Sequence, residues 1–598
     1  MPALRAHQEP PAAAKPPHPR GLGDRMGRGG GIRTRVGEAA RQPGEDDDQD
    51  KPLNRWSVDA WGKGKISSKD VLEIAAAAHA QGAVGALQLR SVKHARNAQR
   101  ALVDALGLPS GAPDFTWLEI PTKRGPNTAH PFLLPHLWLE ALHKVDELWS
   151  ARVAGKPGAA KQFWSSMSHS PAVRDHPAMK RQDWGTSIPL GFHGDGGAFS
   201  HQDSLYVFAF NSLLGGGETK VQRFLMTTIR KTDLVPGSIE AIMKIFAWSF
   251  NCCVAGKSPS VDHTGRRIST MGKPRELAGG WKGILMSVRG DWDFYVSVFR
   301  FPHWQCAINM CWLCAASGLH DSELLYSDCS QSAQWRDTRR THATWLAALR
   351  ADGAPTPPLF DVVGLRLDAM MIDILHCVDL GVAAHIAANI LLELVQKRAW
   401  GGSTQDVAIA ALMVALKAWY SKQKSTRKVQ GSLTLERLRT NGGWPKLKAK
   451  AAQVRHIARF VLEMALTHDA GILHDRRRLA IAQLLVRFYD LIEQGGMFLD
   501  ASAIAEIQQI GKDLPMLYSN FAKEAFAAGV RMWKVQPKLN LFQHLCEWQV
   551  PLGLNPRMYW TYADEDLVGQ LIEVASSCHP FTVHAISLFK WLHVSFKQ

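Results

Sequence analysis

Short apolar segments follow one another in the middle of the chain and predict a small sheet. Residues 188–195, 204–211 and 221–229 are short and rich in β-branched or aromatic side chains, which is typical of strands. Residues 238–250 have apolar positions at helical spacing, a serine at the expected N-cap and an acidic residue in the first turn. After a polar loop, residues 283–288 predict a fourth strand. The predicted order is therefore three strands, a helix and a further strand.

Two of these predicted strands lead into an aspartate. The first ends in Gly-Phe-His-Gly-Asp195, and the fourth continues into Ser-Val-Arg-Gly-Asp291. Phosphodiester chemistry often uses two divalent cations about 3.5 to 4 Å apart, and magnesium prefers oxygen ligands. We interpret the two aspartates, with one further acid, as a carboxylate cation site on a ribonuclease H-like mixed sheet. The alternative is that both are ordinary turn aspartates beside glycines.

Composition favours a large globular protein with a polyanionic partner. The chain has 598 residues, 46% of them hydrophobic, with 21 tryptophans and a formal net charge of +16. For a nuclease-like site this charge favours nucleic acid as the partner. We expect no segment long and apolar enough to span a membrane. The N-terminus has no signal peptide with an apolar centre, so an intracellular location is expected.

The N-terminal part is predicted to contain a tail and a helical region. Residues 1–55 are rich in Pro, Gly and Arg, end in an acidic run and should be disordered. Residues 56–150 are predicted to be mainly helical, with two helices between residues 67 and 106 and basic residues from Arg90 to Arg100. This region is either a DNA-binding module or a helical cap on the core, which we expect to begin at residue 151.

A cysteine pair follows the fourth strand. Cys311-Trp-Leu-Cys314 has the spacing of half a zinc site, because a tetrahedral site needs four ligands. The residues available nearby to complete such a site are His303, Cys306, His320 and Cys329. The alternative is that the thiols are buried as small apolar groups.

A polar pair interrupts an apolar stretch further along the chain. Asp373 and His376 are three residues apart, so they share one face of a helical turn. A functional pair would orient the scissile phosphate or support the cation-binding carboxylates. A structural pair would cap the helix that continues to Leu394.

The order of these features resembles that of eukaryotic cut-and-paste DDE transposases, among them the CACTA/EnSpm-like and related mobile-element families. In such enzymes a D-x-x-H or C-x-x-H signature follows the second catalytic aspartate, and a helical insertion precedes the last acid. Residues 400–550 have an almost wholly helical pattern and match that insertion. The resemblance covers roughly residues 189–577. It implies an α/β core over residues 151–399, the insertion, and a C-terminal helical part over residues 551–598.

The resemblance also implies a position for the third acid. Residues 533–544 are similar to a P-K-x-H-x-x-x-H segment that precedes it in some of these families, with Asn540 where a histidine is common. An acidic cluster then opens an amphipathic helix, and we choose Glu565 from it, with Glu573 and Glu547 as fallbacks. The alternative is that acids in a first helical turn only favour the backbone dipole.

In the implied mechanism Asp195, Asp291 and Glu565 hold two Mg²⁺ or Mn²⁺ ions that promote in-line attack on phosphorus. Asp293 is a reserve ligand. The implied partners are DNA at mobile-element ends and further copies of the chain, and the implied location is the nucleus. Two alternatives stay open. One is a nuclease of the same fold without strand transfer, and the other is a decayed or domesticated DNA-binding descendant without activity.

Basic residues are concentrated inside the predicted insertion. Phosphate contacts by such side chains would supply sequence-independent affinity for DNA that falls with salt. The alternative is a solvated charged surface. The residues are Lys422, Lys424, Arg427, Lys428, Arg437, Arg439, Lys446, Lys448 and Lys450.

Overall fold

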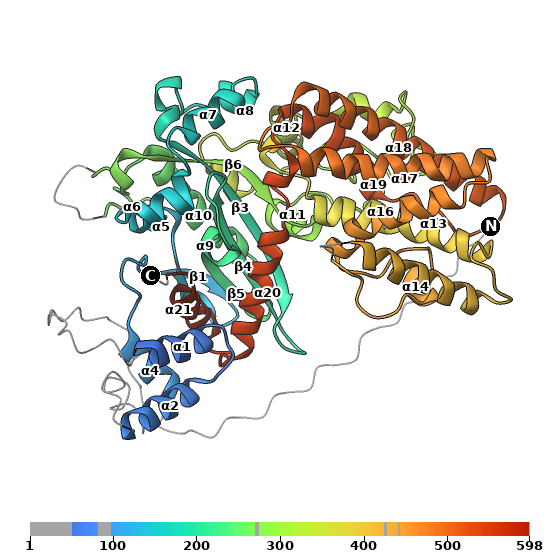
Figure 1. Ribbon diagram of the computed structural model, residues 1–598. Helices are drawn as coiled ribbons and strands as arrows, with labels where there is room; N and C mark the ends of the chain where they lie inside the picture. Colours follow the sequence, from blue (N-terminus) through green and yellow to red (C-terminus); the bar gives the residue numbers. More distant parts are fainter. Residues whose placement is uncertain (1–50, 82–96, 269–273, 424–426, 441–442, 597–598) are drawn as a thin grey trace, which may run out of the picture. The chain divides into compact units, whose positions relative to one another are not determined.

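A four-stranded mixed sheet lies at the centre of the protein (Figure 1). The computed structural model describes residues 51–598, except 82–96, 269–273, 424–426, 441–442 and 597–598. Residues 1–50 of the predicted tail lie outside the described residues. Helix α1 (Lys51–Gly62) begins directly after it, so the predicted boundary at residue 55 falls inside this helix.

The sheet contains the four predicted strands, which are β3 (Ser187–Ala198), β4 (Ser204–Ser212), β5 (Phe224–Arg230) and β6 (Lys282–Arg289). Their order is β5-β4-β3-β6. The pairs β3–β4 and β4–β5 are antiparallel, whereas β3 and β6 are parallel. A parallel neighbour requires a crossover, and helix α10 (Ser238–Ala255) lies between β5 and β6 in the chain. The prediction of a mixed α/β protein is confirmed at this level.

Two details differ from the prediction. The short helix α9 (Thr219–Gln222) occupies the predicted start of β5. The N-cap of α10 is Gly237, whose φ of 90° is readily adopted by glycine, and Ser238 is the first helical residue. The Ser238 hydroxyl donates to the carbonyl of Pro121 and accepts from the backbone NH of Val235, so it links α10 to a neighbouring strand.

Alternation along β3 divides its side chains between two faces. Phe192 stacks parallel to Phe208 of β4, and both contact Phe246 of α10 edge-on. The intervening positions face helix α20 (Tyr562–Ser576) instead, since a Cβ at Gly197 would lie 3.0 Å from the Ile572 side chain. The absence of a side chain at Gly197 lets α20 lie close to the strand that carries Asp195.

Two helices are long and apolar enough to cross a membrane, so the expectation that no such segment exists is wrong. They are Ser238–Ala255, which is α10, and Leu375–Gln396. Within them, 61% and 94% of the apolar window is buried inside the protein. Both therefore serve as core helices in this fold, because their apolar side chains already have protein neighbours.

The chain beyond β6 passes through an irregular region before it returns to the sheet. Helix α11 (Trp292–Phe299) follows Asp291, and α12 (His342–Ala351) follows the cysteine pair. Met370 then forms a parallel bridge with Val288 of β6, at the free side of that strand. A π-helical segment, Leu375–Ala383, leads directly into α13 (Ala384–Gln396).

The predicted insertion is mainly helical. Its helices over residues 451–467, 473–494 and 501–527 pack on one another in that order (Figure 1). The expectation is wrong for most of its basic part, because residues 423–450 contain only the four-residue helix α15 (Leu435–Leu438) among the described positions. The longer helices are α14 (Gln405–Lys422), α16 (Ala451–Thr467), α17 (Leu473–Gln494), α18 (Ala501–Ala527) and α19 (Pro537–His544).

The last two helices return to the sheet, with α20 against β3 and α21 (Val583–Ser595) against β5. Helix α1 packs on α21 and on α2 (Ser68–Ala80), and α2 packs on α4 (Ala98–Leu106), so the two predicted N-terminal helices are confirmed. Most of the basic residues between them lie outside the described residues. The remaining elements before β3 are β1 (Thr116–Thr122), β2 (Gly125–Phe132), α5 (Pro135–His143), α6 (Asp146–Trp149), α7 (Ala159–Ser166) and α8 (Pro171–Arg174).

Candidate active site

The parallel pairing of β3 and β6 brings the two predicted aspartates to one edge of the sheet. His193 of β3 is paired with Arg289 of β6, and Asp195 and Asp291 each follow two residues later. Asp291 caps helix α11, since its carboxylate accepts from the backbone NH of Phe294 at 2.7 Å. Asp195 on β3 and Asp291 directly after β6 therefore lie at the same end of two neighbouring strands.

Glu565 reaches the same place from the first turn of α20. Its carboxyl shares a hydrogen bond with Asp195, and its Oε1 lies 3.5 Å from Nε2 of His376. Burial and the charge of Asp195 raise the pKa of Glu565 to about 8. Burial and the same neighbouring charge also raise the pKa of Asp291. Three carboxyl groups from separate elements thus converge. The raised pKa values of Glu565 and Asp291 indicate that their negative charges are not fully compensated by the surroundings. A bound cation would supply the missing positive charge.

Helix α20 is fixed beside Glu565 by a buried ion-pair network. Asp564 is fully buried, and its Oδ1 accepts from Nε of Arg223 at 2.6 Å and from Nη2 of Arg289 at 3.1 Å. Burial opposes ionisation of Asp564, but the two guanidinium groups hold its pKa well below the usual range. Nη2 of Arg289 also donates to Oδ1 of Asn211 on β4 at 2.6 Å. The network joins the first turn of α20 to β4, to β6 and to the residue directly before β5.

Asp373 supports both Glu565 and His376. Its carboxylate accepts from the backbone NH of Thr561 at 3.0 Å and from the Thr561 hydroxyl at 2.8 Å, directly before α20. It also accepts from the backbone NH groups of Leu375 and His376, so the predicted capping role is present. One side chain thus holds the ends of two helices that meet at the acids.

The same carboxylate orients the imidazole of His376, whose Nδ1 lies 2.7 Å from Asp373 Oδ2. Burial lowers the pKa of His376, but Asp373, Glu565 and Asp291 together raise it to about 9. His376 is therefore protonated at neutral pH and presents Nε2 toward Glu565. Its role toward a scissile phosphate stays a prediction.

The other acids considered from the sequence have different surroundings. The Asp293 side chain is 77% exposed, and its Oδ1 lies 3.5 Å from Nε2 of His303. Glu547 is paired with Arg336, and Glu573 with Lys65. All three glutamates therefore have a basic partner, but only Glu565 also lies beside Asp195.

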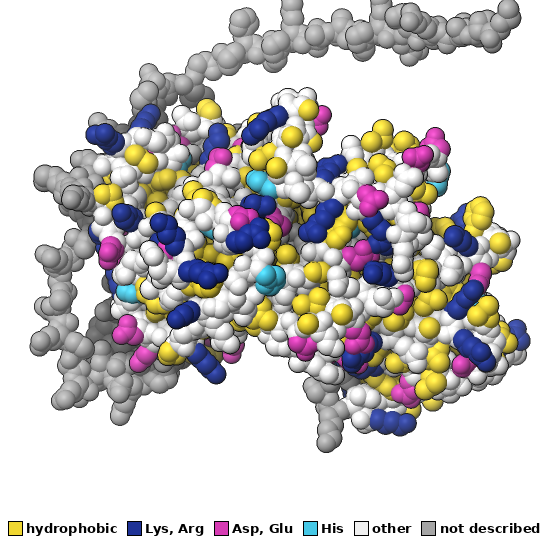
Figure 2. Space-filling view, turned by 90° about the horizontal axis from the view of Figure 1, so that it is seen from above, with side chains coloured by type: hydrophobic (Ala, Val, Ile, Leu, Met, Phe, Trp, Pro, Cys, Tyr) yellow, Lys and Arg dark blue, Asp and Glu magenta, His cyan; other side chains and the backbone are white. Residues whose placement is uncertain are grey.

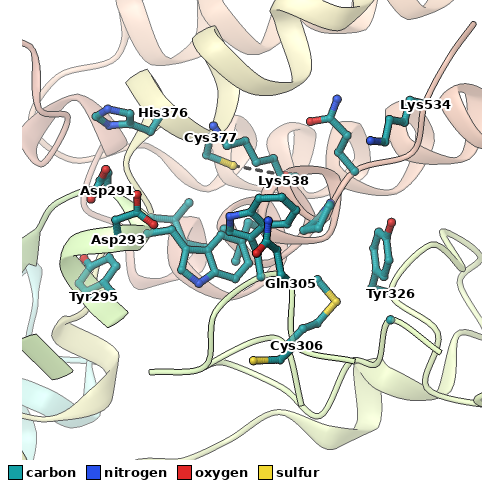
Figure 3. Close-up of a pocket in the computed structure, with 18 of the residues that line it drawn as sticks. Asp291, Asp293, Tyr295, Gln305, Cys306, Tyr326, His376, Cys377, Lys534 and Lys538 are labelled. Carbon is teal, nitrogen blue, oxygen red and sulfur yellow. Dashed lines mark hydrogen bonds between the residues drawn. The ribbon is translucent and has the colours of Figure 1, made fainter. Parts of the chain in front are cut away.

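A cavity of about 780 Å³ opens beside the acids and the imidazole. Figure 3 shows Asp291, Asp293 and His376 at one end of it, Lys538 in the middle beside Cys377, and Lys534 toward the other end. No sequence pattern predicted this cavity, because its walls come from segments more than 200 residues apart.

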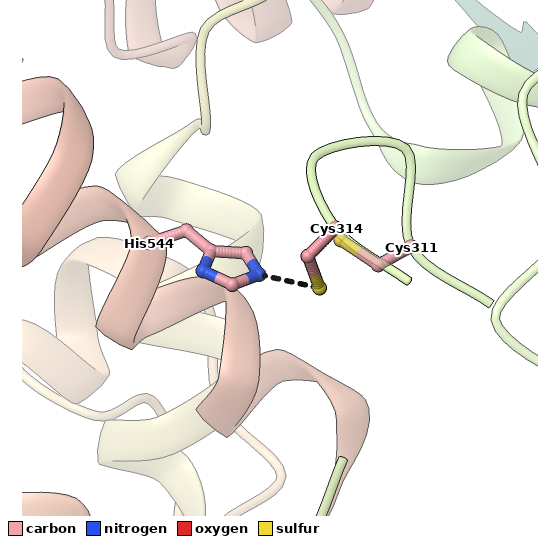
Figure 4. A group of neighbouring side chains, drawn as sticks. All are labelled: Cys311, Cys314 and His544. Carbon is pink, nitrogen blue, oxygen red and sulfur yellow. Dashed lines mark hydrogen bonds between the residues drawn. The ribbon is translucent and has the colours of Figure 1, made fainter. Parts of the chain in front are cut away.

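The cysteine pair lies beside a histidine that is distant in the sequence. The ligand atoms of Cys311, Cys314 and His544 all lie within 4.8 Å of one another, and all three residues are buried (Figure 4). Sγ of Cys314 lies 3.3 Å from Nε2 of His544. Burial disfavours the thiolate, yet the hydrogen bond with Cys314 and the neighbouring imidazole lower the pKa of Cys311 well below its usual value. Two sulfurs and an imidazole are a donor set suited to Zn²⁺.

None of the four residues suggested by the sequence belongs to this cluster. Cys306 and His320 are exposed, and His303 lies against Asp293. Cys329 donates to the carbonyl of Ser327. The signal for His544 was its place at the end of the Pro-Lys segment, which is similar to the P-K-x-H-x-x-x-H pattern.

The predicted DNA-binding residues divide into two groups. Arg437 and Arg439 are half-buried and donate from Nε to the carbonyls of Lys448 and Gly443 at 3.2 and 2.9 Å, so they shape their own loop. Figure 2 shows Lys and Arg side chains spread over one face of the molecule among acidic and apolar ones. Lys424 lies outside the described residues. The exposed members are Lys422, Arg427, Lys428, Lys446, Lys448 and Lys450.

No protein-family model matches this sequence, and a search of curated proteins finds no similar one. The functional argument therefore depends on the geometry of the carboxylates, the imidazole and the cavity.

Proposed function

We propose that the protein is a transposase-like DNA-processing enzyme that cleaves phosphodiester bonds with divalent cations and transfers strands at the ends of a mobile element. The observation that carries this proposal is the convergence of Asp195, Asp291 and Glu565, with the pKa of Glu565 raised to about 8 by burial and by Asp195. Stability alone gives no reason to gather like charges in a buried place, and cation binding does.

The sheet supports the same proposal. A ribonuclease H-like core has three antiparallel strands, a crossover helix and a fourth strand parallel to the first, with acids where the first and fourth strands end. The order β5-β4-β3-β6, with α10 before β6, agrees with that description. The parallel bridge between Val288 and Met370 lies where a fifth strand of such a core would add.

The donor set fits Mg²⁺ or Mn²⁺, which take carboxylate oxygens. Among the described residues, only Cys311, Cys314 and His544 have ligand atoms that all lie within 4.8 Å of one another, so the three acids are more widely spaced than that. When bound, the ions would promote attack on phosphorus and stabilise the leaving oxygen. Without them Glu565 retains its proton at neutral pH, so cation and proton compete for this carboxyl.

The chain itself contributes orientation and charge. Asp373 holds the imidazolium of His376 beside Glu565, where its Nε2–H can donate to a phosphate oxygen. The network around Asp564 keeps the first turn of α20 in place while a substrate binds. Asp564 acts by positioning, since it is fully buried and does not line the cavity. Asp373 lines the cavity beside His376, and its carboxylate orients that imidazole.

A zinc ion is part of the proposal, with Cys311, Cys314 and His544 as three of its four ligands. It would connect the loop after α11 to the end of α19, and so hold the helical region against the sheet-bearing part. Trp548 stacks on the His544 ring with centroids 3.9 Å apart, which restricts the orientation of that imidazole. A ligand held in this way loses little freedom on metal binding.

The experiment is cleavage of plasmid and linear DNA by the purified protein in Mg²⁺, Mn²⁺ or Ca²⁺. Asp195→Asn, Asp291→Asn and Glu565→Gln should each lower the rate at least about a thousandfold, because several kcal/mol of charge stabilisation are lost. Asp566→Asn is the matched control, since this acid is exposed one position further along α20 and accepts a hydrogen bond from the side chain of Gln570. Cleavage that survives all three substitutions would refute the proposed site.

The two alternatives give different results in the same assay. A nuclease of this fold would cut in an acid-dependent manner but would never join the new 3′-hydroxyl to a target plasmid. A decayed or domesticated descendant would bind DNA without cutting it. Three further expectations follow from the resemblance. The DNA partner is tested by joining of paired mobile-element ends, and the assembly of several copies by the mass of the protein in solution. The nuclear location is tested by imaging.

A further inference from the structure

The cavity beside the acids has ends of opposite charge. Its walls come from the segment after β6, the loop before the cysteine pair, the irregular chain before α16 and the connection from α18 to α19. Asp291, Asp293 and His376 lie at one end (Figure 3). At about 780 Å³ its volume lies within the usual range for a ligand site.

Three lysines surround His385 in the cavity wall, with Lys538 nearest to the acids. Lys446, Lys534 and Lys538 all line the cavity. Burial lowers the pKa of His385 to about 4, and Lys446, Lys538 and Lys534 each contribute to that shift, so their charges act at one place. Across the described residues none of the three lysines has a carboxylate within ion-pair distance. This part of the cavity is therefore suited to a phosphate group.

Two tryptophans of the cavity wall are unusually exposed. Trp304 is 42% exposed and Trp444 is 39% exposed, although both line the cavity, whereas Trp312 in the same wall is buried. Trp304 comes from the loop before the cysteine pair, and Trp444 lies two residues before Lys446. Exposed indole faces beside lysines are suited to nucleobases, because every base stacks on an aromatic face whatever its sequence.

We propose that this cavity binds an unpaired nucleotide of the DNA strand whose scissile phosphate lies at the acids. The base stacks on the exposed indoles of Trp304 and Trp444, and the adjoining phosphate contacts the lysines. A base inside a duplex cannot enter, so the strand must be frayed or the nucleotide turned out of the helix. This inference rests on the proposed function and specifies that the DNA substrate is locally unpaired when it is bound.

The test measures binding to two labelled single strands of equal length in Ca²⁺, which permits binding without cleavage. One strand is oligothymidine, and the other has the same sugars and phosphates without bases. The proposal predicts that Trp304→Ala and Trp444→Ala each weaken oligothymidine binding roughly tenfold and leave abasic binding unchanged. Trp444→Phe should retain most of the affinity. Trp117→Ala is the matched control, since this exposed tryptophan lies on β1 outside the cavity.

Lys446→Ala and Lys534→Ala should weaken both strands alike, because a phosphate contact does not need a base. Equal binding of the two strands by the wild type, or tryptophan variants that match the wild type on oligothymidine, would overturn the inference. If the wild type also cuts DNA in an acid-dependent manner, the proposed function survives that failure. If the wild type binds neither strand, both are overturned.

Discussion

The substitution Asp564→Asn is predicted to loosen the first turn of α20 and to displace Glu565. Asp564 and Arg289 are both fully buried, and only 8% of the Arg223 side chain is exposed. The asparagine keeps one acceptor for Arg223 and Arg289. Its amide group, however, would face Nη2 of Arg223, which now donates to Asp564 Oδ2 at 3.3 Å.

The expected cost is about 3–5 kcal/mol, which is typical when one partner of a buried ion pair is removed and charge is left behind. The structure places this cost toward the upper part of that range, because two guanidinium groups lose their counter-charge together. Among the described residues, Nε and Nη1 of Arg289 are already buried without a partner, and apart from Asp564 its guanidinium has only the neutral acceptor Oδ1 of Asn211. Replacing Arg289 by Met in the same chain removes one of the two buried charges and should recover part of the loss.

Hydrogen exchange of the α20 peptides is the suitable assay, since a chain of 598 residues need not unfold in one step. Exchange should accelerate by about two to four orders of magnitude in Asp564→Asn. The control Asp566→Asn should stay within about 0.5 kcal/mol of the wild type. Wild-type protection of α20 in Asp564→Asn would refute the view that this network positions Glu565.

Two further predictions concern other buried groups. Asp379 accepts from the hydroxyls of Tyr489 and Tyr562, and burial raises its pKa to about 7. The pKa of Asp379 in the unfolded chain is about 3.9, so the folded state holds this proton more tightly. The contribution of Asp379 to the free energy of unfolding is therefore complete below about pH 4. It is lost as pH rises through about 7, by up to about 4 kcal/mol. Asp379→Asn should abolish that dependence in urea titrations across this range, and an unchanged pH slope would contradict it. Elemental analysis of the purified protein should find about one zinc per chain. Cys314→Ser and His544→Ala should each lose it, Cys306→Ser should retain it, and a zinc-free wild type would exclude the site.

The sheet and its two aspartates were predictable because the determining pattern is local. Apolar runs of strand length ended on Asp195 and beside Asp291, and their parallel pairing follows from one crossover helix. The choice of Glu565 over Glu547 and Glu573 had no such local basis. The difference lies in tertiary partners, Arg336 and Lys65, which occupy the other two acids.

Contacts distant in sequence account for what was missed. Cys314 and His544 are 230 residues apart, so only the folded chain brings them together. Asp564 belonged to an acidic cluster in the sequence, and nothing there indicated two buried arginines. The basic residues 423–450 are mostly irregular in structure, and the glycines and Pro445 within them were the signal against a helix.

Binding of Mn²⁺, followed by electron paramagnetic resonance, tests the central claim that Asp195, Asp291 and Glu565 form one cation site. The account predicts that the wild type binds Mn²⁺ and that Asp195→Asn, Asp291→Asn and Glu565→Gln each weaken binding at least tenfold, a typical loss when a ligand group is disturbed. Asp566→Asn should bind as the wild type does. Unchanged Mn²⁺ binding in all three variants would contradict the account.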